Sequence, residues 1–308
     1  MKVVLVGGSG LIGRRIAALL AGRGEDVLIL SRDPAKRRGR LPAGVAVEAW
    51  SPSDPAGLSD RLNGTDAVVN LAGVPIGPRP WTPGRKRAIL ESRITATRSI
   101  VAALGPLETG SRPAVLLSAS GTDTYTGQDA VPATESSPPS SGFLADVCRA
   151  WEAEAERASA LGVRVAIMRI GFVLAPGAKA LGLYTIPFRL HLGGPIGSGR
   201  QWMSWVHIDD VARLAVFALD DARVVGPINA VGPHPARQAD VAAAIGTALG
   251  RRSWLRVPAW AVRLALQGQA TLPLDSRRVL PARATELGFR FTWTELPAAM
   301  RDVLGTAQ

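Results

Sequence analysis

Short apolar runs alternate with longer stretches of helical spacing through the first half of the chain. The run KVVLV at 2–6 is too short and too β-branched for a helix, so it predicts a buried strand. Four more runs of this kind follow, at 26–30, 66–71, 113–119 and 164–170. Stretches in helical spacing lie between them, at 11–20, 85–104 and 143–160. This alternation predicts an α/β fold, a doubly wound parallel sheet covered by helices on both faces.

The pattern changes after about residue 175. Residues 175–201 are rich in Gly and Pro and show no period. A helix is predicted at 209–220, and PINAVG at 227–232 predicts a short strand that returns to the sheet. The remaining helical runs lie at 238–250, 258–267 and 275–287, before a last stretch TELPAAMRDVLG at 294–305. We therefore expect a smaller, mostly helical C-terminal lobe packed beside the sheet.

Composition limits the class of protein. With 308 residues, 47% of them hydrophobic, the chain can bury a sizeable core. No apolar run reaches the ~18 residues of a membrane span, and the N-terminal run is too short for a signal peptide, so we expect a cytoplasmic protein without a membrane partner. The single cysteine, Cys148, excludes an intrachain disulfide framework. The three histidines lack the spacing of a metal site, so no metal is expected.

The net charge of +11 raises nucleic acid as a possible partner. The basic residues are scattered, however, and no basic run is interleaved with aromatic residues. One local cluster, RDPAKRRGR at 32–40, reads as a solvated loop or a loop that faces an anion. We therefore expect no nucleic-acid partner.

The sequence GGSGLIG directly follows the first predicted strand and opens the first helix. In this context Gly7 makes the tight turn, Gly10 lets the backbone approach a pyrophosphate, and Gly13 lets the helix pack closely on the strand. The N-terminus of the helix then offers free N–H groups and the positive end of its dipole to the phosphates. A glycine pattern in this setting predicts a dinucleotide-binding site.

The residues after the second strand distinguish between two cofactors. Enzymes that bind NAD usually carry an acidic residue there, which binds the ribose 2′-hydroxyl. This strand instead continues with Ser31 and Arg32, a hydroxyl and a guanidinium that suit a 2′-phosphate. Asp33 comes later and precedes a proline, which fits a turn or a cap. Arg93 is a second cation that could reach the adenine end, or a solvated helix residue. The sequence therefore predicts that the bound cofactor is NADP(H).

Several motifs together resemble the extended short-chain dehydrogenase/reductase superfamily: GGSGLIG, NLAG at 70–73, the strand end at 118–120, and WVHIDDVA at 205–212. Longer stretches, above all GGPIGSGRQ at 193–201, look like its atypical "epimerase family protein" branch with a C-terminal domain of unknown function. The resemblance covers essentially the whole chain. It implies a Rossmann-type doubly wound fold, an NADP-type cofactor and a substrate pocket between two lobes, but no established reaction.

The resemblance also divides the chain and implies its cofactor contacts. The NADP-binding domain is expected at 1–175, with 205–232 returning to its sheet, and the smaller lobe at 176–204 and 233–308. The implied contacts are Gly10, Leu11, Ile12, Ser31, Arg32, Leu71, Ala72, Arg93 and Val173. Leu71 and Ala72 have a reason of their own, because apolar or small residues at a strand's end let backbone approach the adenosine. Val173 would line the nicotinamide, or belong to the core.

The superfamily's usual Tyr-x-x-x-Lys pair, in which the lysine lowers the pKa of the tyrosine, is missing. The only tyrosines are Tyr125 and Tyr184, and the residues four positions later are Asp129 and Phe188. The stretch that should hold the pair, GFLADVCRAWEAEAE, has neither Tyr nor Lys. Ordinary alcohol–ketone redox chemistry is therefore in doubt.

Three residues are candidates to replace the pair. Ser118 or Ser120, at the end of the fifth strand, could hydrogen-bond a substrate oxygen, and Tyr125 in the following loop could donate a proton. Either serine could instead serve in a cap or turn, and Tyr125 could be a surface-loop residue.

Three more residues are candidates for the substrate side. Arg200 follows a glycine-rich loop and could bind a carboxylate or a phosphate, Trp205 could line an apolar pocket, and His207 could transfer a proton. The alternative role of Arg200 is that of a solvated loop residue. Trp205 could instead belong to the core, and His207 could make a structural hydrogen bond. We expect a pocket between Ser118–Tyr125 and Arg200–His207, at the carboxyl ends of the strands.

The sequence thus predicts an NADP(H)-dependent oxidoreductase or epimerase that acts on an unknown small molecule with a non-standard catalytic group. A non-catalytic NADP(H)-binding regulator is the alternative. The chain is expected to act as a monomer or a homodimer.

Overall fold

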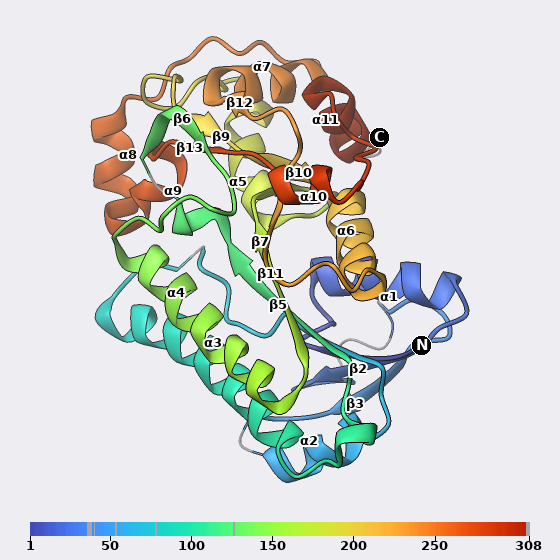
Figure 1. Cartoon of the computed structure of the whole chain (residues 1–308). Coiled ribbons are helices and arrows are strands. Elements are labelled where there is room, and N and C mark those ends of the chain that lie inside the picture. The colour runs from blue at the N-terminus through green and yellow to red at the C-terminus, as the bar shows by residue number, and fades with distance from the viewer. Residues whose placement is uncertain (36–38, 40, 53, 78, 126, 306–308) are drawn as a thin grey trace.

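A seven-stranded parallel sheet forms the centre of the protein in this computed structural model, which describes residues 1–305 except 36–38, 40, 53, 78 and 126 (Figure 1). The strand order is β3-β2-β1-β4-β5-β7-β11, and every neighbouring pair is parallel. The strands are β1 Lys2–Val6, β2 Asp26–Ser31, β3 Ala46–Ala49, β4 Ala67–Asn70, β5 Val115–Gly121, β7 Arg164–Ile170 and β11 Gly226–Ala230. The expected doubly wound fold is confirmed.

Helices cover both faces of the sheet. They are α1 Leu11–Gly22, α2 Pro55–Leu62, α3 Pro83–Leu104, α4 Phe143–Glu156 and α6 Ile208–Asp220. Successive residues of a strand point to opposite faces, so Val3 and Leu5 pack with α1 and α6, whereas Val4 and Val6 pack with α2, α3 and α4. The central strands are buried on both faces, which explains why they form unbroken apolar runs in the sequence.

The later part of the chain builds a smaller lobe, which Figure 1 shows at the end of the molecule opposite α2 and β3. Its helices are α5 Lys179–Arg189, α7 Gln238–Ala248, α8 Ala259–Leu266, α9 Thr271–Leu274, α10 Ala282–Glu286 and α11 Leu296–Gly305. Three two-stranded pairs lie outside the main sheet, β8 Phe172–Leu174 with β10 Trp205–His207, β9 Trp202–Met203 with β12 Ala236–Arg237, and β6 Gln128–Ala133 with β13 Arg277–Val279. Single 3₁₀ turns lie at Thr109–Ser111, Thr122–Thr124, Arg157–Leu161 and Gln267–Ala270.

One predicted element is wrong, and several elements were not predicted, among them the short strands outside the main sheet. The helix expected at 275–287 is a strand, β13, followed after Leu280 and Pro281 by the one-turn helix α10. Proline restricts the residue before it to extended backbone, so the helix cannot run through that point. The sequence did not predict α2, the edge strand β3, whose side chains are mostly exposed, or α5, which contains Gly182 and Pro187. Residues 36–38 and 40 of the basic cluster lie outside the described residues.

Candidate cofactor and substrate site

The glycine loop joins the carboxyl ends of three neighbouring strands. The N–H of Gly7 donates to the carbonyl of Leu30 at the end of β2, at 3.0 Å. Gly7 has a φ of 76°, and a Cβ there would lie 2.9 Å from the Cα and N of Ala72, which follows β4. A side chain at position 7 would therefore be strained and would also push away the loop after β4. The loop fixes the crevice between β1, β2 and β4.

Helix α1 presents an open N-terminus to this crevice. Its N-cap, Gly10, has no side chain to cap the helix, and the first turn contains no acidic residue. A Cβ on Gly13 would lie 2.4 Å from the carbonyl oxygen of Gly8, so helix packing requires glycine there. A Cβ on Gly10 would meet nothing nearer than the Gly7 carbonyl oxygen at 3.7 Å. The space over Gly10 is therefore open, and the free N–H groups around it suit a pyrophosphate.

The end of β2 adds a hydroxyl and a guanidinium to the crevice. The Ser31 hydroxyl lies 3.3 Å from the Ser9 hydroxyl and accepts a hydrogen bond from the backbone N–H of Asp33 at 3.4 Å. Arg32 is exposed, and it makes no ion pair with any residue that the structure describes. A free guanidinium beside a hydroxyl fits the 2′-phosphate of an NADP-type cofactor.

Buried polar side chains hold the loop after β4. The Nδ2 of Asn70 donates to the Thr97 hydroxyl at 2.8 Å and to the Ser118 hydroxyl at 3.3 Å, while its Oδ1 accepts from the N–H of Ala72 at 3.2 Å. Asn70 is completely buried, so these bonds order the ends of β4 and β5 together. They hold Leu71 and Ala72 half-buried at the crevice, as the expected cofactor contacts require.

Arg93, on helix α3, hydrogen-bonds the loop that follows β4. Its Nη1 donates to the carbonyls of Val74 at 3.2 Å and Ile89 at 2.9 Å, and its guanidinium lies 5.0 Å from the ring centre of Trp151. Burial lowers the pKa of Arg93. This geometry gives Arg93 a structural task, and its contact with the cofactor stays a prediction.

The first turn of α1 and strand β8 meet at the smaller lobe. Leu11, Ile12 and Val173 are partly buried against the cluster that contains Trp205 and Ile208. Val173 is paired in register with Val206 of β10. The structure therefore brings these three expected contacts to one apolar wall, which also leaves a core role open for Val173.

The candidate catalytic residues belong to a buried polar network at the ends of β5 and β7. The Ser120 hydroxyl donates to Oε1 of Glu152 on α4 at 2.5 Å. Arg169 of β7 holds Glu152 in a bidentate ion pair, with 2.9 Å from Nε to Oε1 and 2.6 Å from Nη2 to Oε2, and its Nη1 donates to the hydroxyl of Tyr125. Ser118, by contrast, only accepts from Asn70 among the bonds identified. The two serines therefore differ. The Ser120 hydroxyl already donates its hydrogen to Glu152, whereas the Ser118 hydroxyl can still donate its hydrogen to another group.

Burial sets the protonation of this region. It raises the pKa of the Tyr125 phenol above its ordinary value, although the adjacent Arg169 guanidinium acts in the opposite direction. Burial lowers the pKa of Arg169, but its hydrogen bonds to Glu152, the negative charge of Glu152 and the contact with Tyr125 together outweigh that effect and leave the pKa raised. Burial also raises the pKa of the Cys148 thiol to about 12. At neutral pH, Tyr125 is thus a proton donor and not a base, and Cys148 is not a thiolate.

Arg200 lies at an open cleft of about 550 Å³ whose lining comes from the smaller lobe, except for Gly127. The cleft is lined by Gly127, Ser198, Arg200, Gln201, Arg237, Leu274, Asp275 and Ser276. The Arg237 guanidinium lies 3.8 Å from the ring centre of Trp202, with Arg278 4.6 Å from the same ring. The cleft reaches Gly127, two residues beyond Tyr125, so it approaches the Ser118–Tyr125 region but is not lined by those side chains.

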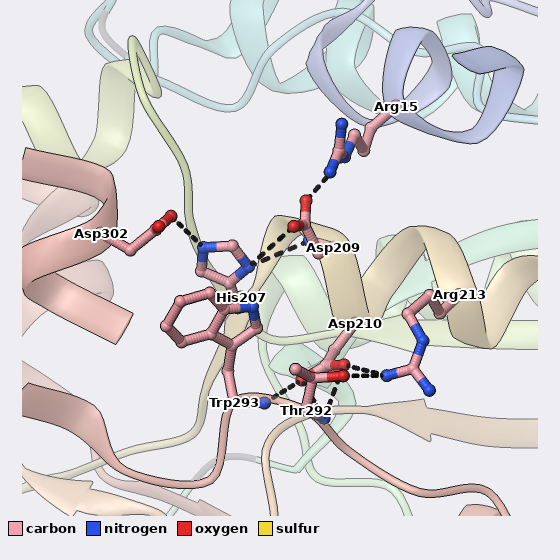
Figure 2. A network of polar contacts seen from close by, with 8 residues as sticks. All are labelled: Arg15, His207, Asp209, Asp210, Arg213, Thr292, Trp293 and Asp302. Atoms are coloured by element: carbon pink, nitrogen blue, oxygen red, sulfur yellow. Dashed lines mark hydrogen bonds and ion pairs between the residues drawn. The ribbon is translucent and has the colours of Figure 1, made fainter. Parts of the chain in front are cut away.

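Trp205 and His207 do not line this cleft. Trp205 is buried and donates its indole N–H to the His234 carbonyl at 2.9 Å. His207 is buried as the N-cap of α6, where Nδ1 accepts from the N–H of Asp209 at 3.2 Å and Nε2 lies 3.1 Å from Asp302 (Figure 2). This pattern fits a neutral ring with its proton on Nε2. Both residues have structural partners, and the geometry favours the structural alternative for each.

Two family matches cover most of the chain. Residues 3–232 match the NAD dependent epimerase/dehydratase family, and residues 257–303 match a domain of unknown function, DUF1731. The chain belongs to the NAD dependent epimerase/dehydratase family. The resemblance drawn from the motifs is confirmed, including the C-terminal domain.

Named relatives narrow the branch of the family. The chain is 37% identical to the epimerase family protein SDR39U1 homolog, chloroplastic, of Arabidopsis thaliana, over 99% of this chain and 87% of the relative. It is 32% identical to the epimerase family protein YfhF of Bacillus subtilis, over 99% of this chain and 98% of that protein. The crystal structure of human epimerase family protein SDR39U1 with NADPH superposes with a TM-score of 0.86 at 31% identity, covering 99% of both chains. The UDP-glucose 4-epimerase of Thermus thermophilus, at 18% identity and a TM-score of 0.79, shares the fold.

Three residues of the candidate site were not singled out in the sequence. Asn70, Glu152 and Arg169 are polar side chains in otherwise apolar or core-facing segments. Asn70 and Arg169 lie at or near the carboxyl ends of their strands, where ligands bind in open parallel sheets. That position was the available signal for both. Glu152 lies on α4 with Glu154 and Glu156, and only the structure shows that it is the one paired with Ser120 and Arg169.

Two negative observations apply to the described residues. No helix among them is both long enough and apolar enough to cross a bilayer. They contain no cluster of three or more His, Cys, Asp or Glu side chains placed to hold a metal ion.

Proposed function

We propose that this chain binds NADP(H) in the crevice between β1, β2 and β4 and uses it on a small molecule as an oxidoreductase or epimerase. The observation that carries the proposal is the open space over Gly10 at the N-terminus of α1, beside the free guanidinium of Arg32. Phosphates fit the first feature and a 2′-phosphate fits the second. The NADPH in the human relative's structure supports the same cofactor.

The bound cofactor would supply or accept a hydride, and the chain's own residues would handle the proton and the substrate oxygen. Ser118 keeps a hydroxyl hydrogen free and is the better placed serine to donate to an oxygen. Tyr125 carries its proton at neutral pH, and its hydroxyl accepts a hydrogen bond from Arg169, so it can act as an acid. Glu152 and Arg169 would position Ser120 and Tyr125 without touching substrate.

The substrate side of the proposal rests on the cleft at Arg200. Arg200 and Arg237 line it together with polar groups, which favours a small molecule that carries a carboxylate or phosphate. We assign the cofactor domain to 1–175 with 205–232 and the substrate lobe to 176–204 with 233–308. A cytoplasmic location and a monomeric or homodimeric state stay predictions; the Arabidopsis relative is named chloroplastic.

A non-catalytic NADP(H)-binding regulator is the second candidate. It is favoured by the burial of Ser118, Ser120 and Tyr125, whose side chains are 5% exposed or less, and by the lack of a Tyr-x-x-x-Lys pair. The two candidates differ in turnover. Steady oxidation of NADPH with any member of a panel of ketones, aldehydes and sugar derivatives supports the enzyme; tight NADPH binding with no turnover across that panel supports the regulator.

The cofactor preference can be tested by calorimetric titration of NADPH and NADH. NADPH should bind more tightly, and Arg32→Ala should weaken NADPH binding by about 1–3 kcal/mol, the value of a charge-assisted contact, while NADH binding stays nearly unchanged. Arg301→Ala, an exposed arginine on α11, is the matched control and should bind both like the parent. Equal affinities for the two cofactors in the parent chain would overturn the assignment.

A further inference from the structure

Several large apolar side chains of the smaller lobe are exposed to solvent. The most exposed are Leu264 at 76%, Trp260 at 69%, Leu190 at 64% and Trp254 at 62%, with Leu192 and Leu255 also exposed. Helix α8, AWAVRLAL, is almost entirely apolar, yet Val262 is its only buried residue. A helix that is apolar on all sides normally lies inside a protein or against another apolar phase. So many exposed apolar side chains on neighbouring segments indicate a binding surface.

Backbone hydrogen bonds bring together the segments that carry these residues. The N–H groups of Trp254 and Leu255 both donate to the Gly193 carbonyl, at 2.9 and 3.1 Å, and the Trp254 indole donates to the His191 carbonyl at 2.9 Å. The segment 254–257 thus lies beside 190–196 at the end of α5, and it leads after Pro258 into α8. We call this surface the apolar–basic face, made of Leu190, Leu192, Trp254, Leu255, Trp260 and Leu264 with the arginines named below.

The face carries one sign of charge. Residues 157–208 and 241–274, which supply it, contain none of the 25 acidic residues of the chain. Exposed arginines are interspersed among the apolar side chains, at 189, 251, 252, 256 and 263. Asp275 lies close enough to act on the charge of Arg263, but it is already 3.8 Å from Arg277. The occupant of the face must therefore accept both apolar side chains and a row of cations.

We propose that the apolar–basic face is a docking surface for an anionic lipid bilayer, on which the protein lies without spanning it. Tryptophan and leucine enter the boundary between headgroups and acyl chains, and arginines bind anionic headgroups. The earlier expectation of no membrane partner followed from the lack of a long apolar run, which bears on spanning segments and not on a surface of this kind. The proposal does not depend on the cofactor or the reaction.

A second copy of the chain fits this surface less well. A twofold interface sets the same patch against itself, so the five arginines would face five arginines with no acidic residue between them. A folded protein partner normally seats its anchors in pockets. The cleft at Arg200 and a second cleft, lined by Arg189, Leu249, Arg251 and Leu304, contain none of the six apolar side chains of the face. A bilayer needs no such pocket.

The test is co-sedimentation of the full chain with vesicles of phosphatidylcholine alone and of phosphatidylcholine with phosphatidylglycerol. The parent should bind the mixed vesicles and not the neutral ones. Two double variants, Trp260→Ser with Leu264→Ser and Arg252→Glu with Arg256→Glu, should each weaken binding at least tenfold. Arg290→Glu with Arg301→Glu changes the charge equally outside the face and should bind like the parent. Circular dichroism melting and calorimetric NADPH titration check that each variant is folded.

Three results would overturn the proposal. The first is the absence of binding to the mixed vesicles at low salt. The second is binding that falls equally in the control variant, because net charge alone would then explain it. The third is a concentration-dependent dimer, measured by sedimentation velocity, that the Trp260→Ser, Leu264→Ser variant dissociates, because the face would then be an interface between two copies.

Discussion

At the scale of single residues, Gly10 and Gly13 at the start of α1 have different roles. Gly13 is needed by the protein itself, since a Cβ would lie 2.4 Å from the Gly8 carbonyl oxygen. Gly10 has room for a methyl group and an ordinary φ of −75°. We expect Gly13→Ala to lower the free energy of unfolding by about 1–3 kcal/mol, as overpacking does. Gly10→Ala should leave it nearly unchanged.

The variants Gly10→Ala and Gly13→Ala test stability and cofactor binding separately. Gly10→Ala should weaken NADPH binding, because the methyl group would occupy the space that the pyrophosphate needs. Urea denaturation gives the stability and calorimetric titration the affinity, both on the same preparations. If Gly10→Ala binds NADPH like the parent, the phosphate does not approach the backbone at this glycine.

The geometry of the glycine loop could be predicted from the sequence better than the buried polar network around Ser120, for a physical reason. Gly7, Gly13 and Arg32 act through backbone conformation and local position, which a short motif encodes. The partners of Ser120 are Glu152, 32 residues away, and Arg169 on a neighbouring strand. No local pattern fixes such a pairing. The burial of Tyr125 likewise follows from β13, a strand that the sequence predicted as helix.

At the scale of elements, the packing of α4 against β5 buries the Cys148 thiol and predicts a response to alkaline pH. Cys148 is 5% exposed, and its Sγ lies 3.6 Å from the Gly121 carbonyl oxygen. Burial raises its pKa from 9.0 to about 12. The folded state therefore holds its proton after the unfolded chain has lost it, so stability falls as pH rises from 9 toward 12.

The expected slope for one such group is about 1.4 kcal/mol per pH unit inside that window. Cys148→Ala should flatten the dependence of unfolding free energy on pH between 9 and 11, whatever its effect at pH 7. Cysteine has no second copy in the chain, so the contribution is not duplicated. Parallel curves for parent and variant across pH 9–11 would show that the thiol is not protected in the folded state.

Elements were predictable where one signal dominated. Strands β1, β4, β5 and β7 are buried on both faces and were found from their apolar runs alone. The segment 275–287 carries apolar and polar residues that satisfy a helical pattern, but β13 pairs with β6, more than 140 residues earlier. Helix α5 contains Gly182 and Pro187, and it forms because Leu181, Thr185 and Phe188 are buried against the smaller lobe. Tertiary contacts outweigh local propensity in both segments.

At the scale of the whole molecule, the two parts of the chain share one core. Ala284 and Phe289, from the C-terminal segment, belong to the same buried cluster as α1, α6 and one face of the sheet. Polar contacts reinforce this junction, as Figure 2 shows: Asp209 connects Arg15 of α1 with His207, and His207 contacts Asp302 of α11. A shared core predicts that the parts unfold together.

Asp210 provides the sharpest test of that coupling. Its carboxylate is fully buried and accepts hydrogen bonds from the N–H groups of Thr292 at 3.0 Å and Trp293 at 2.8 Å, and from Arg213 at 2.8 Å (Figure 2). Asp210→Ala removes three hydrogen bonds to a buried carboxylate, so we expect a loss of about 1–3 kcal/mol in unfolding free energy. Asp220→Ala, which removes only the exposed pair with Arg23, should cost much less.

Calorimetry then distinguishes one cooperative unit from two. In a single unit, Asp210→Ala lowers the melting temperature of the only transition, and saturating NADPH raises that same transition in parent and variant alike, because a ligand of the folded state stabilises everything that unfolds with its site. If the parts were independent, the variant would split the transition in two, and NADPH would move only the one that belongs to the sheet. The clusters around Ala284 and Phe289 argue for the first result, since removing the C-terminal segment from the sheet would expose apolar surface on both sides of the junction.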